Sequence, residues 1–290
     1  MGQLKGVGVA LITPFHEDLS IDFESLTRLI DYNIDNGTNF LVVMGTTAEA
    51  ATISSEEKKQ VIDHIIKANN KRVPLVLGIG GNNTMEVKKQ IEEADLSDFD
   101  AVLSVSPYYN KPNQEGLYQH YKALASTGKN IIIYNVPSRT GQNVEASTTL
   151  RLAEEFPNLI MIKEAAPNIL QYFDILRLKP ANFNLVSGDD EYTLPVTLAG
   201  GNGVISVIGQ GYPKEFSTMV QLAFDGKVNE AYEIHNKLVE ITRLIFAEGN
   251  PAGIKTVLAE LGIIKNYLRL PLVAASAGLQ EKIKAEMAKI

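Results

Sequence analysis

Cysteine is absent from this sequence of 290 residues, and histidine is scarce. Without cysteine the chain has no disulfide bond, no thiolate metal site and no cysteine nucleophile. Its histidines are His16, His64, His120 and His235, and they are scattered without the spacing of paired metal ligands. We therefore expect no metal site in this protein.

Positive charge is also limited. Lysine and arginine together number 27 against 34 acidic residues, which gives a formal net charge of −7 at pH 7. Nucleic acids and anionic membranes need a positively charged binding surface, so neither is expected as a partner. No apolar run has the length of a membrane span, and the first residues, MGQLKGVGVALITPF, do not resemble a secretion leader. We therefore expect a cytoplasmic protein.

Short, continuous apolar runs recur along the first two thirds of the chain. Such runs are typical of parallel strands that are covered on both faces. They lie at residues 6–13, 39–45, 73–80, 100–106, 130–136, 159–165, 183–188 and 203–209. Helix-length amphipathic segments separate most of them, and no GxGxxG motif follows the first run, which argues against a dinucleotide-binding open sheet. The pattern predicts a (β/α)8 barrel, a TIM barrel, over residues 1–225.

From about residue 226 the pattern changes. The segments KVNEAYEIHNKLVEITRLIFAEG, NPAGIKTVLAELG and AASAGLQEKIKAEMAKI all read as helices, and no further strand is expected. We therefore predict a C-terminal helical extension over residues 226–290 that packs on the barrel.

A barrel of this kind carries its chemistry where the strands end and the following loops begin. Polar residues at the predicted strand ends include Thr46, Thr47, Tyr108, Tyr109, Tyr134, Arg139, Lys163, Asp189 and Asp190. All of them would converge on one mouth of the barrel.

Lys163 is the least expected of these residues, because it ends the apolar run Leu159-Ile160-Met161-Ile162. One interpretation is a rim residue that pairs with Glu164. The other is a Schiff-base nucleophile, because an apolar barrel interior disfavours the charged form of an amine and so favours the reactive one. No other lysine ends a predicted barrel strand, and the residue alone leaves both interpretations open.

The neighbouring strand ends are similarly ambiguous. Tyr134 is either a core tyrosine or a neutral relay that donates and accepts protons. The backbone and hydroxyl groups of Thr46 and Thr47 suit a small carboxylate but also fit an ordinary turn. Arg139 is either a surface residue or a fork for a carboxylate. For the Asp189-Asp190 pair, a position at a helix N-terminus is favoured over a metal site.

Several of these segments together form a recognisable pattern. The motifs GTTAEA, SPYYNKP, YNVPSRTG, KEA, SGDD and GGNGVISV occur in this order, and NPAGIKTVLAELG and LRLPL follow near the C-terminus. The chain thereby resembles the dihydrodipicolinate synthases of the pyruvate-dependent class I aldolase superfamily. The resemblance implies a lyase that condenses pyruvate with L-aspartate 4-semialdehyde to 4-hydroxy-tetrahydrodipicolinate, in the diaminopimelate route to lysine. It implies a covalent lysine–pyruvate imine and no metal or organic cofactor.

The resemblance also implies residue roles. Lys163 would form the imine, Tyr134 would be the general acid and base, and Thr47 and Tyr109 would be its relay partners. Tyr109 would reach in from a neighbouring subunit, which implies a homo-oligomer, in this family usually a tetramer made of two tight dimers. The remaining implied substrate contacts are Thr46 and Thr47 for the pyruvate carboxylate, Arg139 for the semialdehyde carboxylate, and the main chain of Gly188 and Ile205.

Two features depart from the family pattern. Ala48 stands where glycine is usual, and alanine would be strained if the backbone there required a positive φ. Relatives that are inhibited by lysine have an effector site whose matching positions here are Ala50, Ser55, Lys58, Asn82, Glu86 and Tyr108. Because Lys58 would repel the ammonium group of lysine, we predict weak or absent feedback inhibition.

Two alternative functions remain at this point. Another Schiff-base aldolase, such as N-acetylneuraminate lyase or a 2-keto-3-deoxy sugar acid aldolase, would share Lys163 and Tyr134. Arg139 in its YNVPSRTG context favours a dicarboxylic product instead. A barrel that binds a metabolite without catalysis is supported only by Ala48.

Overall fold

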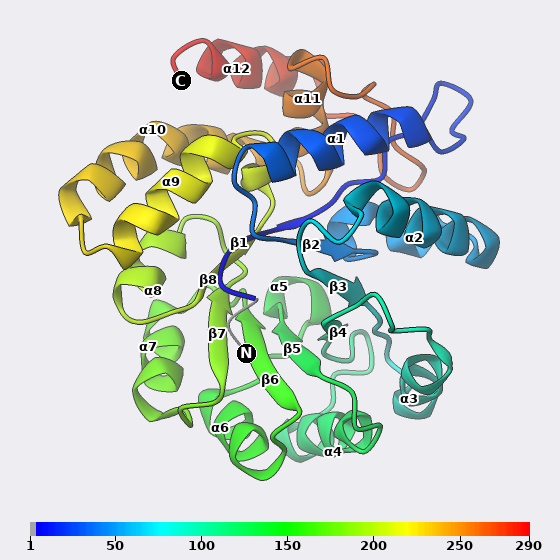
Figure 1. Ribbon diagram of the computed structural model, residues 1–290, viewed down its shortest axis with the longest axis vertical. Coiled ribbons are helices and arrows are strands. Elements are labelled where there is room, and N and C mark those ends of the chain that lie inside the picture. The colour runs from blue at the N-terminus through cyan, green and yellow to red at the C-terminus, as the bar shows by residue number, and fades with distance from the viewer. Residues whose placement is uncertain (1–3) are drawn as a thin grey trace.

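The structure is a computed structural model that describes residues 4–290. Eight parallel strands follow one another in sequence order and close into a barrel, with helices around its outside (Figure 1). The strands are β1 (Gly6–Ala10), β2 (Phe40–Val43), β3 (Leu75–Gly78), β4 (Ala101–Val105), β5 (Ile131–Asn135), β6 (Leu159–Glu164), β7 (Asn184–Ser187) and β8 (Gly203–Ser206). The predicted (β/α)8 barrel is confirmed.

The first four barrel helices begin at residues whose side chains cap them. The Asp22 side chain caps α1, and Ser54 and Glu57 form a reciprocal capping box at the start of α2. The helix α8 has only 6 residues, in keeping with Pro195 inside it. The barrel helices are α1 (Phe23–Asp35), α2 (Ser55–Asn69), α3 (Thr84–Glu93), α4 (Gln114–Ala125), α5 (Pro137–Thr140), α6 (Ala146–Glu155), α7 (Ile169–Leu178), α8 (Thr193–Leu198) and α9 (Pro213–Phe224).

Alternation along the strands divides their side chains between two layers. One set packs inside the barrel in a single apolar cluster that includes Phe40, Ile132, Met161 and Ile205. The other set, which includes Ile162, packs against the surrounding helices. A polar side chain near a strand end therefore faces either the barrel interior or the helices, according to its position in this alternation.

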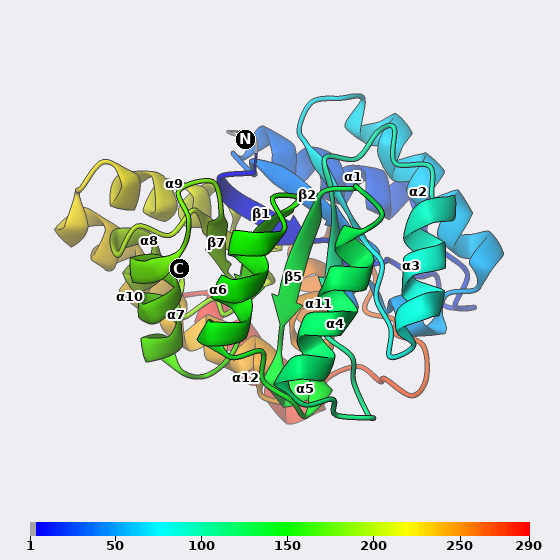
Figure 2. The same cartoon turned by 90° about the horizontal axis from the view of Figure 1, so that it is seen from below.

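Three helices follow the barrel: α10 (Val228–Phe246), α11 (Ala252–Glu260) and α12 (Ala277–Met287). Their buried residues share one hydrophobic cluster with residues of β1, β2 and β3. Figure 2 shows α5, α11 and α12 all lying toward the end of the barrel to which the arrow of β5 points. The predicted boundary at residues 225 and 226 lies between α9 and α10, and the division into two domains stays a prediction.

Among residues 4–290, no helix combines the length and the apolar character that crossing a membrane requires.

Candidate active site

Lys163 lies on β6 with its side chain inside the barrel, and only 5% of the residue is exposed. Its Nζ lies 4.4 Å from the centroid of the Tyr134 ring. Within residues 4–290, no carboxylate or hydrogen-bond acceptor contacts this nitrogen. Glu164, the suggested partner on a solvated rim, faces the helices instead and bonds to Gln171 of α7. The rim interpretation is therefore wrong, and the amine is buried without a counter-ion.

Tyr134 lies directly beside Lys163. The two residues pair in the register between β5 and β6, and their side chains enter the same interior. Tyr134 is 7% exposed. A phenol that faces a buried amine across adjacent strands can give and take protons near it.

Gly188 gives the Lys163 side chain its space. A Cβ atom at position 188 would lie 2.9 Å from Cε and 3.0 Å from Cγ of Lys163. The Gly188 nitrogen also donates a hydrogen bond of 2.6 Å to the main-chain oxygen of Glu164. A side chain at 188 would thus displace the lysine, which is a physical reason for glycine here. Ile205 is fully buried on β8, inside the same barrel.

Thr46 and Thr47 form the short 3-10 turn η1 (Thr46–Ala48), which directly follows β2. The first N–H groups of such a turn have no partner within it and point outward from its start. Thr47 is buried, and its Oγ1 accepts a hydrogen bond of 2.9 Å from Asn250 Nδ2. The two threonines thus present backbone donors at the carboxyl end of the barrel.

The turn accommodates Ala48 without strain. Met44 and Glu49, on either side of the turn, have positive φ values of 57° and 56°, and Ala48 is not among the residues with a positive φ. Ala48 is buried, and its main-chain oxygen accepts a bond from Thr13 Oγ1. The strain that a glycine-to-alanine change would cause at a positive φ therefore does not arise.

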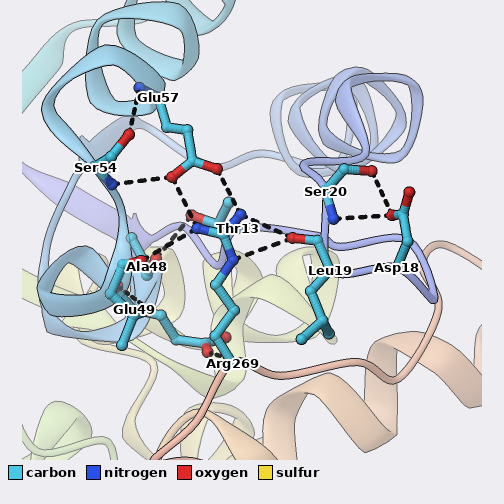
Figure 3. A network of polar contacts seen from close by, with 10 residues as sticks. Thr13, Asp18, Leu19, Ser20, Ala48, Glu49, Ser54, Glu57 and Arg269 are labelled. Carbon is cyan, nitrogen blue, oxygen red and sulfur yellow. Dashed lines mark hydrogen bonds and ion pairs between the residues drawn. The ribbon is translucent and has the colours of Figure 1, made fainter.

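Residues of the C-terminal segment hold this loop in place. Glu49 pairs with Lys255 of α11 through Oε1, at 2.5 Å, and accepts a bond from the Arg269 main-chain nitrogen at Oε2. Figure 3 shows the Arg269 guanidinium joining the main-chain oxygen of Leu19 to the carboxylate of Glu57, which itself caps α2. The chain after residue 249 is therefore part of the support of the Thr46–Thr47 turn.

Arg139 lies on the short helix α5, just beyond the end of β5, and is exposed. Its Nη2 contacts the main-chain oxygen of Asn250 at 3.5 Å. Asn250 therefore contacts both Arg139 and, through its side chain, Thr47. The guanidinium remains accessible at the same end of the barrel as the lysine.

Tyr109 is not brought to the lysine within one chain. It lies in the loop between β4 and α4 with a φ of 73° and is 89% exposed, while its neighbour Tyr108 is 43% exposed. A positive φ at a bulky residue is strained and is most often found at functional sites.

The acidic pair that follows β7 differs from the expectation. Asp190 does not cap α8, which begins at Thr193 without a side-chain cap. Its Oδ2 instead accepts bonds of 3.1 Å from the main-chain nitrogens of Val207 and Ile208, just after β8. Burial raises the pKa of Asp190 to about 6. This residue therefore ties β7 to the loop that follows β8.

The positions matched to an effector site divide between two regions. Ala50, Ser55 and Lys58 lie on the turn η2 (Ala50–Thr52) and on α2. Asn82 and Glu86 lie just before and within α3, and the Asn82 main-chain oxygen accepts a bond from Asn110, two residues after Tyr108. Feedback by lysine stays a prediction. Within the described chain, no group of three or more metal-type side chains forms a site.

Sequence reasoning missed the contacts that four polar residues make around the site, although it named Glu164 as a possible partner of Lys163. Asn135 and Glu164 follow the two catalytic candidates on their strands, and Asn250 and Lys255 come from the C-terminal segment. A lone lysine in the apolar run AGIKTVLA was a usable signal for Lys255. No local signal marks Asn250, because its contacts are with residues more than 100 positions away in the sequence.

A closed (β/α)8 barrel with an unpaired lysine inside it, beside a tyrosine of the adjacent strand, defines a class. It is the class of barrel lyases that bind a keto acid as a Schiff base. Comparison with known proteins identifies the family: the chain belongs to the dihydrodipicolinate synthetase family, whose model matches residues 3–290.

Individual relatives agree with this assignment. The 4-hydroxy-tetrahydrodipicolinate synthase of Flavobacterium psychrophilum is 54% identical over 284 residues, which cover 98% of this chain and 97% of the relative. The crystal structure of dihydrodipicolinate synthase from Thermotoga maritima is 38% identical, with a TM-score of 0.96 over 99% of this chain and 98% of that one. A dihydrodipicolinate synthase variant described as monomeric is also 38% identical, with a TM-score of 0.96 and coverage of 99% and 97%. The expected enzyme class, a lyase of lysine biosynthesis, is confirmed.

Proposed function

We propose that this chain condenses pyruvate with L-aspartate 4-semialdehyde through a Schiff base on Lys163, giving 4-hydroxy-tetrahydrodipicolinate. The observation that carries the proposal is the Lys163 amine, which is buried beside Tyr134 without a counter-ion. Within the described residues no ion pair holds this nitrogen, which leaves it available to attack a carbonyl carbon.

The chemistry proceeds in balanced steps. The Lys163 amine attacks the ketone carbon of pyruvate, and water leaves as the imine forms. Loss of a methyl proton gives an enamine, whose carbon attacks the aldehyde carbon of the semialdehyde. The amino group of the second substrate then attacks the imine carbon, closes the ring and releases the lysine. Tyr134 is the group beside the amine that moves the protons, with Thr47 and Tyr109 as its relay partners.

Binding of the two carboxylates is assigned to different residues. The N–H groups of Thr46 and Thr47 suit the carboxylate of pyruvate, since they open a turn at the carboxyl end of β2. Arg139 suits the carboxylate of the semialdehyde, because its guanidinium is exposed and its fork matches carboxylate geometry. Main-chain groups of Gly188 and Ile205 complete the proposed contacts. No metal or organic cofactor enters these steps.

The assembly is a further part of the proposal. Tyr109 is 89% exposed in one chain, so its role in the relay requires a second subunit that brings its own tyrosine to this site. We infer a homotetramer made of two tight dimers, and analytical ultracentrifugation measures its mass. One relative is described as a monomeric variant. If this chain were also a monomer and kept full turnover, Tyr109 would have no part in the relay. The cytoplasmic location likewise stays a prediction.

The experiment that tests the function is a two-substrate assay. The purified protein should form product from pyruvate and L-aspartate 4-semialdehyde and should cleave no N-acetylneuraminate. Tyr109→Phe should lower turnover while the enzyme still forms the pyruvate adduct. Cleavage of a sugar acid in place of condensation would contradict the proposal. An inhibition curve with L-lysine tests the predicted weak feedback in the same assay.

A further inference from the structure

Behind the pair of Tyr134 and Lys163 lies a second pair of residues that none of the proposed steps uses. In the register of β5 and β6, Tyr134 lies opposite Lys163, and the next residues, Asn135 and Glu164, lie opposite each other. Because side chains alternate along a strand, the second pair faces the helices while the first faces the barrel interior. Tyr134 and Lys163 therefore face the barrel interior, and Asn135 and Glu164 lie directly behind them, on the outer face of the same two strands.

The carboxylate of Glu164 is held by hydrogen bonds on both oxygens. Asn135 Nδ2 donates to Oε1 at 2.9 Å and to Oε2 at 3.0 Å. The main-chain nitrogen of Ala166 donates to Oε1 at 2.7 Å, and Gln171 Nε2 of α7 donates to Oε2 at 2.8 Å. Neither Asn135 nor Glu164 has any exposed surface.

No cation balances this carboxylate within residues 4–290, since every ion pair of the described chain involves other acids. Burial raises the pKa of Glu164 to about 7, and the hydrogen bonds from Asn135, Ala166 and Gln171 oppose that rise. A fully buried acid without a counter-ion is costly to keep in a fold. Such a residue is expected to have a specific role at its position.

The pairing of β5 and β6 explains why a side-chain bond between the two strand ends is needed here. Its register shifts between Ile131 and Ile132, so the pairing of the strand ends differs from that of their beginnings. Irregular pairing of this kind disrupts the ladder locally and re-aims the side chains that follow it. The Asn135–Glu164 bond comes after the shift and next to Tyr134 and Lys163, where it fixes the two strand ends relative to each other.

We propose that Glu164, with Asn135, is a positioning residue for the reaction: from behind the barrel wall it holds β5 and β6 in the register that places Lys163 Nζ beside the Tyr134 ring. This inference rests on the proposed role of Lys163 as the Schiff-base residue. Gln171 extends these hydrogen bonds to α7 and, by donating to the main-chain oxygen of Val144 and to Asn143 Oδ1, to the loop before α6. Glu164 itself touches no substrate.

The test is the rate of imine formation at saturating pyruvate, measured by rapid borohydride trapping and mass spectrometry. Glu164→Gln places an amide N–H₂ group among the donors of Asn135, Ala166 and Gln171, so at least one bond is lost. We expect this variant to form the imine about tenfold more slowly or worse, since small misplacements of reacting groups have effects of this size. The KM for pyruvate should change little, because the proposed carboxylate contacts are on β2.

Gln210→Met is the matched control. Gln210 is also fully buried. Its side chain accepts a hydrogen bond from Ile12 N at 2.9 Å and donates one to the main-chain oxygen of Ala10 at 2.8 Å, so it links the end of β1 to the loop that follows β1. In the closed order of strands, β1 lies across the barrel from β5 and β6. We expect this variant to lose stability but to form the imine within about twofold of the wild-type rate. If imine formation slowed equally in both variants, the slowing would come from a general loss of stability, and the proposal would be overturned.

Gln171→Met provides a milder variant in case Glu164→Gln does not fold. It removes one donor from the carboxylate and leaves Glu164 in place, so the slowing should be smaller but measurable. Wild-type rates of imine formation in Glu164→Gln, or in Gln171→Met where the first variant cannot be obtained, would overturn the inference, as would a rise in KM alone. Absence of any adduct on wild-type Lys163 would instead overturn the proposed function on which the inference rests.

Discussion

Two lysines are buried within residues 4–290, one inside the barrel and one where the C-terminal helices meet it. Lys163 is 5% exposed and Lys255 is 0% exposed. Each side-chain nitrogen lies over an aromatic ring, at 4.4 Å from the centroid of Tyr134 for Lys163 and at 4.3 Å from that of Phe15 for Lys255. Burial and aromatic contact therefore do not distinguish them.

The difference lies in the partners. Lys255 Nζ donates to the Glu49 carboxylate at 2.5 Å and to the main-chain oxygen of Tyr267 at 2.9 Å, whereas Lys163 has no such partner within residues 4–290. Burial lowers the pKa of Lys255, and the Glu49 carboxylate opposes that change. We therefore expect the paired Lys255 to serve the fold, and we propose the unpaired Lys163 for the chemistry.

The largest expected effect separates the two lysines by activity. Lys163→Ala should lower turnover by about 10⁴-fold or more, as removal of a nucleophile does, and should change the free energy of unfolding little, because no polar partner is left behind. Steady-state kinetics and urea unfolding measure the two quantities. A variant that keeps turnover would contradict the role of Lys163.

The second prediction concerns stability. Lys255→Met leaves the buried Glu49 carboxylate without its cation and should cost about 3–5 kcal/mol in the free energy of unfolding. The double variant Glu49→Gln with Lys255→Met removes the uncompensated charge and should recover much of the loss. If the single variant were as stable as the wild type, the ion pair would have no structural role.

The third prediction tests the space around Lys163. Gly188→Ala places a methyl group 2.9 Å from Lys163 Cε, so the amine should move and turnover should fall by about 10²-fold. Gly278→Ala in α12 is the control, because a Cβ there meets nothing within 4 Å. Equal turnover in both variants would show that the position of the lysine is not limiting.

The smallest expected effect concerns the pH dependence of stability at the buried Glu164. Burial raises the pKa of Glu164 to about 7 from 4.5, so the folded protein holds a proton that the unfolded chain has lost. Stability from this group is therefore present below about pH 4.5 and is lost as the pH rises through about 7, by about 1–3 kcal/mol. Relative to Glu164→Gln, the wild type should be more stable at pH 5 than at pH 8. A constant difference across this range would mean that Glu164 does not titrate in the fold.

Much of the barrel was predictable from local pattern. Apolar runs of strand length, helix caps such as Ser54, and the brief helix around Pro195 all lie in continuous sequence, and the physics that forms them is local. The sequence also marks Lys163 as unusual, because a lysine that ends an apolar run is expensive to bury, although the residue alone left both a rim position and a nucleophile open.

The supports of the site could not be predicted in the same way. Glu49 and Lys255 are 206 residues apart in the sequence, and only the closed fold brings them together. For Glu164 the sequence suggests a partner for Lys163, but alternation along β6 turns the two side chains to opposite faces. Asp190 reads as a helix cap, yet its carboxylate binds the loop after β8.

One measurement tests the comparison of the two lysines most directly. The protein is incubated with pyruvate, reduced with borohydride and digested, and the peptides that contain Lys163 and Lys255 are compared by mass spectrometry. A reduced pyruvyl group should be found on the Lys163 peptide and not on the Lys255 peptide. An adduct on Lys255 with none on Lys163 would contradict the claim that the missing carboxylate is what makes one buried lysine reactive.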